Sequence, residues 1–332
     1  MPFDLELCDL HIHVGAAVAP HILWSIAHQQ GFKLPVKSFW EFRELVTADP
    51  RHVRSLDDYI AILHTWTEKI QSSPAAIERS VYEIIGKEYR SSRVTQIELR
   101  FNPMKRNLGG ERDLDHIIHA ALRGMDRACL EYGCRAGLIF CLAREFDVAL
   151  NEIILDKAIK YRDRGVVGID LAGTEHSRPE TGADAPRYAR IFARARAEGL
   201  GTTVHCGETR ETGAEGVLAV LRELRPDRLG HGIRAVDSPL ALAALAERGT
   251  VLELCPSSNL RTRAVADVAE LGATIARLRA AGVRFTINTD GPYLLMTHLR
   301  QEYELLLREG ILAIDDVAAC TAEARRASFI RA

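Results

Sequence analysis

Eight short runs of apolar and β-branched residues recur along the chain, and segments with helical periodicity lie between most of them. Such runs are typical of strands buried on both faces, as in a parallel sheet. Helical segments such as 240–249, entered from Pro239, and 268–282 fit the connections that parallel strands require. The sequence therefore predicts an α/β fold, a (β/α)8 TIM barrel. The expected strands are LELCDLHIHV (5–14), TQIELRF (95–101), AGLIFCLA (136–143), GVVGIDLAG (165–173), TTVHCGE (202–208), RLGHGI (228–233), TVLELCPSS (250–258) and VRFTINTD (283–290).

The first crossover, about residues 15–94, is much longer than the others and mostly helical. We interpret it as a helical insertion at the top of the barrel, where a substrate lid would lie. No low-complexity segment, repeat array or clear linker interrupts the chain, so we expect a single domain over residues 1–332. The helical segments of the insertion are PHILWSIAHQQ (20–30), SFWEFRELV (38–46), SLDDYIAILHTWTEKI (55–70) and AAIERSVYEIIGKEYRSS (75–92).

Composition excludes several classes of partner. The formal net charge is −2 and no basic stripe with interleaved aromatic residues occurs, so we expect no nucleic-acid partner. No segment reaches the roughly 18 uninterrupted apolar residues of a membrane span, and the first residues carry no basic region of a signal peptide. Seven scattered cysteines without a C-x-x-C pair predict reduced thiols in a cytoplasmic protein. The sequence does not indicate an oligomeric state.

Histidine and carboxylate residues gather at the predicted carboxyl ends of the strands, where barrels place functional side chains. His11 and His13 are separated by one residue, so both imidazoles point to one face of the first strand. Buried imidazoles need partners, and a metal ion is the most economical partner for two of them. His205 and Asp290, at two further strand ends, supply the missing ligands. The set predicts one zinc ion per chain with an open position for water.

Each part of this pattern also has a simpler interpretation. An isolated H-x-H pair would more often be two histidines hydrogen-bonded to backbone or water, and only the joint pattern favours a metal. Iron, manganese and cobalt are alternatives to zinc because the same ligands bind them.

Three further residues lie at strand ends near this expected site. Glu208, three residues after His205, would be close to the metal without binding it; in an apolar pocket its pKa would be raised, and it would act as a proton donor. His231 lies between two glycines and would serve as a general base or orient the water. Gly173 would expose a backbone N–H to a ligand. The alternatives are a surface ion pair for Glu208, a core histidine for His231 and an ordinary turn for Gly173.

The motifs H-x-H, DLAG, HCGE, GHGI and NTDGP, in this order, resemble the adenosine deaminase family of zinc aminohydrolases, whose fold is a TIM barrel of the metal-dependent hydrolase type. The resemblance extends over almost the whole chain and includes SLDDY (55–59), AIERSVYE (76–83) and IELRFNP (97–103). It implies that the exocyclic amino group of an adenine-type nucleoside is replaced by oxygen, with release of ammonia.

The resemblance also implies a role for each residue. His11, His13, His205 and Asp290 would be the zinc ligands. Glu208 would protonate the ring nitrogen next to the attacked carbon, His231 would position and deprotonate the water, and Gly173 would donate its N–H to another ring nitrogen. Asp290 would in addition orient the attacking oxygen.

Two positions depart from the family pattern. The usual start is H-x-H-L-D-G, with an acid that contacts the ribose 5′-hydroxyl, whereas this chain has Gly15 at the place of that acid. The usual ending T-D-D-P has a second acid close to the imidazole edge of the purine, whereas this chain has Gly291 there. Both missing groups recognise substrate, and hydrogen-bonding groups of this kind discriminate strongly between substrates.

These departures leave several substrates and reactions open. Gly15 would leave room for a 5′-extended adenine nucleoside such as aminodeoxyfutalosine, and Gly291 suggests that the base itself differs, as in a non-purine heterocyclic amine. Another class would be a mononuclear zinc hydrolase of an amide, lactone or phosphoester. A catalytically idle nucleoside-binding protein is disfavoured by the complete set of motifs. Candidate substrate contacts are Arg100, Asn102, Arg144 and Glu175, of which both arginines are equally compatible with structural ion pairs.

Overall fold

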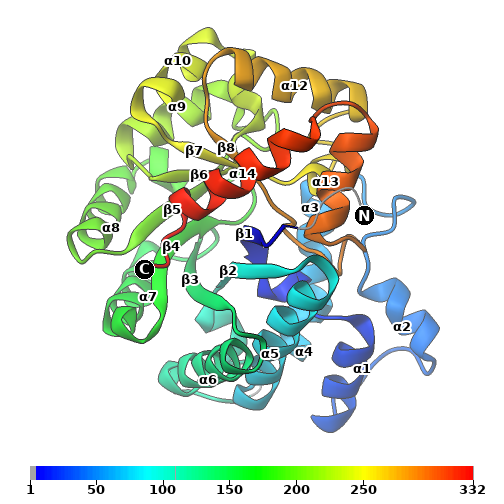
Figure 1. Ribbon diagram of the computed structural model, residues 1–332. Helices are drawn as coiled ribbons and strands as arrows, with labels where there is room; N and C mark the ends of the chain where they lie inside the picture. Colours follow the sequence, from blue (N-terminus) through cyan, green and yellow to red (C-terminus); the bar gives the residue numbers. More distant parts are fainter. Residues whose placement is uncertain (1–4, 109, 332) are drawn as a thin grey trace.

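The computed structural model describes residues 5–108 and 110–331, so the outer limits of the predicted domain, residues 1–4 and 332, lie outside the described residues. In the described ranges, eight parallel strands pair in chain order. Past the last strand, Asp290 donates its amide hydrogen to the His11 carbonyl and accepts one from the His13 amide, both at 2.8 Å. This bridge joins the two ends of the sheet, which confirms the predicted (β/α)8 barrel (Figure 1). The strands are β1 (Leu7–His13), β2 (Val94–Phe101), β3 (Arg135–Ala143), β4 (Val166–Ala172), β5 (Gly201–Cys206), β6 (Arg228–His231), β7 (Val251–Leu254) and β8 (Phe285–Ile287).

Helices connect the strands and surround the barrel (Figure 1). Side chains at several N-termini fix where these helices begin: Asp113, Ser238 and Asp267 each accept a hydrogen bond from a backbone amide of the first turn. The long helices are α5 (Pro74–Ser92), α6 (Leu114–Tyr132), α7 (Val148–Lys160), α8 (Ala185–Ala197), α9 (Gly213–Glu223), α10 (Pro239–Arg248), α12 (Val268–Ala280), α13 (Leu299–Arg308) and α14 (Ile314–Ala327). Shorter turns are η3 (Pro103–Arg106), η4 (Arg162–Arg164), η5 (Pro179–Thr181), η6 (Ile233–Asp237) and α11 (Pro256–Arg261).

The long first crossover contains two structural parts. Its last helix, α5, packs against β2 and α6 and is therefore one of the helices around the barrel. The helical insertion itself comprises residues 14–73, and Figure 1 shows α1 and α2 outside the barrel at one side. Its elements are η1 (Val14–Ala16), α1 (Pro20–Gln29), α2 (Phe39–Leu45), α3 (Leu56–Ile62), the π-helical turn η2 (Leu63–Thr67) and α4 (Glu68–Ile70).

The insertion packs on the segment that follows β8. Tyr59 of α3 is buried in a small apolar cluster with Leu294 and Leu295. The Ala48 amide donates a hydrogen bond to the Leu294 carbonyl at 2.7 Å, which ties the insertion to the same segment. These contacts bring α3 over the carboxyl end of β8, the end at which barrels place their functional groups.

The strand expected at 250–258 is shorter than its apolar run. The strand β7 ends at Leu254, and α11 begins at Pro256. Proline is favoured at the first helical position because its missing N–H has no partner there and its φ is already helical. As a result Ser258 and Asn259 lie in a helical turn above the strand rather than at its end.

Two features bear on the expected environment of the protein. All seven cysteines are free thiols. No helix in the described part of the chain combines the length and the apolar character needed to cross a membrane.

Candidate active site

The four residues predicted as metal ligands come together at the carboxyl end of the barrel. His11 and His13 belong to β1, His205 to β5, and Asp290 follows β8. The Nε2 atoms of His13 and His205 are 3.0 Å apart. The Asp290 Oδ1 atom lies 3.8 Å from Nε2 of His11 and 3.6 Å from Nε2 of His13. Three strands that are far apart in sequence thus direct these nitrogen and oxygen atoms at one point.

The donor atoms fit a bound cation. One ligand atom each of His11, His13 and His205 lies within 4.8 Å of the others, and the buried Nε2 atom of His11 has no hydrogen-bond partner among the described residues. Burial and neighbouring cationic groups lower the pKa of His11 and of His13 well below the usual value, so both imidazoles are neutral and have a lone pair to offer. Burial raises the pKa of Asp290, an effect that a bound cation would oppose.

A second possible metal group consists of His11, His231 and Cys255. The Cys255 thiol donates a hydrogen bond to the Glu253 carbonyl at 3.5 Å, whereas the group of His11, His13 and His205 gains a carboxylate donor from Asp290. The group with His13 and His205 is therefore the better metal site.

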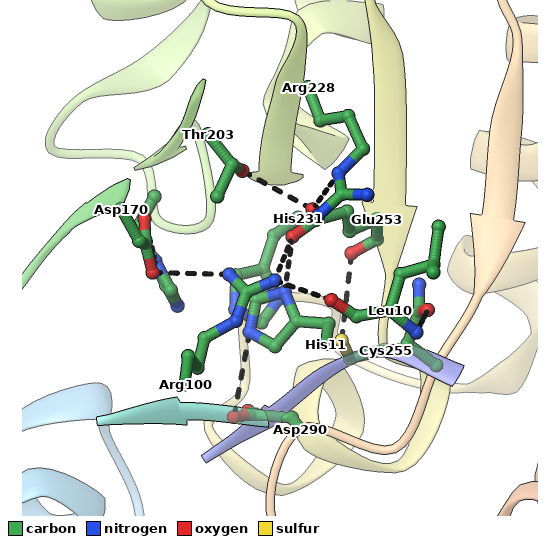
Figure 2. A network of polar contacts seen from close by, with 12 residues as sticks. Leu10, His11, Arg100, Asp170, Thr203, Arg228, His231, Glu253, Cys255 and Asp290 are labelled. Atoms are coloured by element: carbon green, nitrogen blue, oxygen red, sulfur yellow. Dashed lines mark hydrogen bonds and ion pairs between the residues drawn. The ribbon is translucent and has the colours of Figure 1, made fainter. Parts of the chain in front are cut away.

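Carboxylates behind the histidines orient the rings (Figure 2). The Oε2 atom of Glu253 lies 2.7 Å from Nδ1 of His11, and Asp170 approaches Nδ1 of His205 at 2.9 Å. A carboxylate at Nδ1 holds that nitrogen protonated and leaves Nε2 free to bind a metal. The side chain of Ser258 donates to Oδ2 of Asp290 at 2.5 Å, which leaves Oδ1 facing the histidines.

Arg100 links the two carboxylates. Its guanidinium is fully buried and contacts Asp170 at 3.1 Å, Glu253 at 2.8 Å and the Leu10 carbonyl at 2.7 Å (Figure 2). Burial disfavours the Asp170 carboxylate, but His205 and Arg100 outweigh burial and hold its pKa well below the usual value. Arg100 is therefore a structural ion-pair partner, one of the two interpretations that the sequence left open.

Arg144 is also structural. It is buried, pairs with Glu180 at 2.9 Å and donates to the His205 carbonyl at 2.6 Å. The carboxylate of Glu175 accepts the Glu208 amide hydrogen at 3.0 Å and thereby fixes the loop that carries Glu208. Asn102 uses its Oδ1 atom to cap η3 and lines the same cavity as the histidines.

Glu208 and His231 face each other beside the histidine cluster. The Oε2 atom of Glu208 is 3.4 Å from Nε2 of His231. Burial, with repulsion from Glu175 and Asp290, raises the pKa of Glu208 well above its usual value, which favours the protonated carboxyl that can act as a proton donor. Burial and the nearby His205 and Arg100 lower the pKa of His231, which leaves a neutral ring that can accept a proton. The pair thus offers an acid and a base at one site.

Two of these residues have an unusual backbone conformation. His231 has a φ of 59° and Asp290 a φ of 62°, in the left-handed region that non-glycine residues seldom adopt. Such strain costs about 1–3 kcal/mol and occurs preferentially at functional sites. Its position at these strand ends supports a functional role for both side chains.

The three glycines predicted to contact substrate differ in their surroundings. Gly173 and Gly15 line the cavity that contains His13, His205 and Glu208. Gly173 has a φ of 123°, a conformation that favours glycine. A Cβ atom at position 15 would lie 3.2 Å from Nη2 of Arg106 and 3.3 Å from Cγ of Glu68, so the space expected beside Gly15 is bounded by charged side chains. A Cβ atom at position 291 would lie 2.0 Å from the Tyr59 hydroxyl.

Sequence reasoning missed the residues that support this site. Asp170 and Glu253 are acids inside otherwise apolar strands, and their buried positions would have been a usable signal because buried acids need partners. Ser258 and Asn259 lie in α11, where Ser258 contacts Asp290 and the Nδ2 atom of Asn259 is 3.0 Å from Nδ1 of His231. Tyr59 belongs to the family-like segment SLDDY, but no local pattern places it at the site, because only the fold of the insertion brings it there.

Comparison with known proteins agrees with this geometry. The family model described as adenosine deaminase matches residues 6–332. An aminodeoxyfutalosine deaminase of Acidothermus cellulolyticus is 34% identical over 91% of this chain and 82% of its own length, and an adenosine deaminase of Enterococcus faecalis is 31% identical over 98% and 93%. The crystal structure of an adenine deaminase from Arthrobacter aurescens superposes with a TM-score of 0.84 at 21% identity, covering 99% of this chain and 95% of that one.

The family match covers nearly the whole chain, and both of these deaminases exceed 30% identity over at least nine tenths of it. The motifs that carried the resemblance are the ones that converge at the end of the barrel. This chain is a hydrolytic deaminase and belongs to the adenosine deaminase family.

Proposed function

We propose that the protein is a zinc-dependent deaminase of an adenine-type nucleoside, which replaces the exocyclic amino group by oxygen and releases ammonia. The observation that carries this proposal is the placement of Glu208 and His231 beside His11, His13, His205 and Asp290 at one end of the barrel. Acid, base and metal donors of this kind are the groups that hydrolytic removal of an amino group requires.

The three histidines and Asp290 would hold the zinc ion, since three imidazole nitrogens and one carboxylate oxygen suit this metal. When bound, zinc acts as a Lewis acid that makes water nucleophilic at neutral pH. The free thiols support a cytoplasmic location, since a reducing compartment keeps cysteines unpaired.

Residues of the protein itself carry out the remaining steps. Glu208 donates its proton to the ring nitrogen next to the carbon that bears the amino group, which makes that carbon electrophilic. His231 takes a proton from the attacking water, and Asp290 accepts a hydrogen bond that orients it. Gly173 donates its backbone N–H to another ring nitrogen. Collapse of the adduct breaks the bond from carbon to the amino nitrogen, which leaves as ammonia after gaining a proton.

Ammonia release by the zinc-loaded protein tests this proposal. The substrates are adenosine, aminodeoxyfutalosine, free adenine and a set of non-purine heterocyclic amines, assayed at equal concentration. We expect turnover of at least one adenine nucleoside with a kcat/KM in the range of about 10⁴–10⁸ M⁻¹s⁻¹. Turnover of non-purine amines alone would exclude an adenine-type substrate while leaving the family chemistry in place.

A second, narrower proposal concerns the substrate at its ribose end. We infer that the preferred nucleoside carries a polar extension at the 5′ position. Gly15 lacks the acid that holds a free 5′-hydroxyl in the family pattern, and next to it lies Arg106, which is only 1% exposed. Arg106 pairs with Glu68 at 3.1 Å, yet its Nε atom has no hydrogen-bond partner among the described residues. The similarity to an aminodeoxyfutalosine deaminase supports a substrate of this kind.

Replacement of Gly15 by aspartate is expected to weaken the preference for a nucleoside with a 5′ extension. The new carboxylate would lie between Arg106 and Glu68, where it narrows the cavity and offers a partner to a free 5′-hydroxyl. We expect the ratio of kcat/KM for aminodeoxyfutalosine to that for adenosine to fall by about 10-fold or more. Gly182→Asp, which adds an acid at an exposed loop position, is the control. An unchanged ratio in Gly15→Asp would show that position 15 does not select the 5′ group.

A further inference from the structure

We propose that Tyr59 replaces the acid that is missing at position 291 and that its hydroxyl donates a hydrogen bond to an acceptor nitrogen on the five-membered ring of the bound base. The proposal rests on the proposed function, because it assigns a base-recognition group to the same cavity. It also accounts for Gly291 without requiring a base other than a purine.

The hydroxyl of Tyr59 occupies the place where a side chain at position 291 would begin. A Cβ atom built on Gly291 would lie 2.0 Å from the Tyr59 oxygen and 3.3 Å from its Cζ atom, and 2.7 Å from Cβ of Ala16. Real Cβ atoms do not approach other atoms at 2.0 Å, so any side chain at position 291 is incompatible with this placement of Tyr59. The φ of Gly291 lies outside the left-handed region, so the backbone itself does not require glycine. The observed position of the Tyr59 hydroxyl therefore requires glycine, which has no Cβ atom, at position 291.

The ring of Tyr59 is held rigidly. The side chain is 3% exposed and packs in the apolar cluster with Ala48, Val53, Leu294 and Leu295. Because the cluster fixes the ring, the direction of the hydroxyl is fixed as well. A preorganised group of this kind recognises a ligand at a smaller loss of side-chain entropy than a flexible one.

The hydroxyl has no hydrogen-bond partner among the described residues. A buried polar group without a partner carries a penalty that a ligand atom can remove. Tyr59 lines the same cavity as Glu208 and Asp290, and both carboxyl groups are close enough to shift its pKa. The free donor therefore belongs to the same cavity as Glu208, the group that would protonate the base.

A phenol and an imidazole-type nitrogen are complementary. Phenols have a pKa near 10, so the tyrosine hydroxyl is a donor at neutral pH. The five-membered ring of a purine has one nitrogen at its outer edge with an in-plane lone pair. Replacement of that nitrogen by carbon, as in a 7-deazapurine, removes the acceptor and leaves the shape of the base nearly unchanged.

The test compares an adenine nucleoside with its 7-deaza analogue in the wild type and in Tyr59→Phe, both zinc-loaded. We expect the wild type to favour the purine in kcat/KM, and Tyr59→Phe to reduce this preference by about tenfold, since one neutral hydrogen bond is worth on the order of tenfold. The difference in intrinsic reactivity between the two bases cancels when the two proteins are compared. A preference that is the same in both proteins would overturn the proposal.

Two further measurements keep the result unambiguous. Tyr82→Phe removes a tyrosine hydroxyl that donates to Glu131 on α6 at 2.7 Å, and we expect it to leave the preference unchanged. In the wild type alone, a non-reactive purine nucleoside should inhibit about tenfold more tightly than its 7-deaza analogue; equal inhibition would overturn the proposal even if Tyr59→Phe did not fold. Failure of the wild type to deaminate any purine nucleoside would instead overturn the proposed function, and the proposal for Tyr59 with it.

Discussion

Removal of the bound metal is expected to lower the rate of deamination by about a thousandfold or more, and addition of zinc is expected to restore it. Lewis-acid catalysis contributes several kcal/mol to a reaction of this kind, and each 1.4 kcal/mol corresponds to a factor of ten in rate. The donors that would hold the ion are fixed by their hydrogen bonds to Glu253, Asp170 and Ser258, so the metal-free protein retains a site ready to bind again. The measurement combines a chelator titration with the metal content and activity of each fraction.

Two variants distinguish the loss of a predicted metal ligand from the loss of a histidine elsewhere in the protein. His205→Ala removes a predicted ligand, and we expect both the zinc content and the activity to be lost together. His116→Ala removes an exposed histidine that pairs with Glu111 on the surface and is expected to change neither. Full activity of the metal-free protein, or a normal zinc content in His205→Ala, would contradict the ligand assignment.

The fold was predictable because its signal repeats along the chain. Each apolar run such as LIF in β3 has to be buried on both faces, and eight such runs with helices between them leave few architectures. The placement of His11, His205 and Asp290 followed from the same reasoning, since strand ends of a barrel meet at one face. The boundaries were less predictable: the strand expected at 250–258 ends at Leu254, because Pro256 begins a helix.

The residues that sequence reasoning did not find depend on long-range packing. Glu253 touches His11, Arg100 and Arg228 from three other strands, and no local pattern reveals such a set of partners. Tyr59 reaches Gly291 only because the insertion packs on the segment after β8, a contact between residues more than 200 positions apart. His231 and Asp290 also have a positive φ, whereas non-glycine residues prefer a negative one. Departures from local rules of this kind are expected where function constrains the chain.

Replacement of Glu208 by glutamine is expected to lower kcat by about 10²–10⁴-fold, because the reaction loses its proton donor. The amide retains the shape of the protonated carboxyl, so it can keep the contact with Thr262, whose hydroxyl lies 3.3 Å from Oε1 of Glu208. Zinc content is expected to stay unchanged, since Glu208 is not among the predicted ligands. Glu247→Gln, at an exposed position on α10, is the matched control and should retain full activity.

The same substitution is expected to increase stability at neutral pH. Burial raises the pKa of Glu208 in the folded protein, so between the unfolded pKa and the folded pKa the folded state binds more protons than the unfolded state. The free energy of unfolding of the wild type therefore falls as pH rises through this window, whereas glutamine does not titrate. We expect the free energy of unfolding of metal-free Glu208→Gln to increase relative to that of the wild type as pH rises from 4 to 7. Urea unfolding at both pH values measures this gain; an equal pH dependence in the two proteins would mean that Glu208 is ionised in the folded state and cannot be the proton donor.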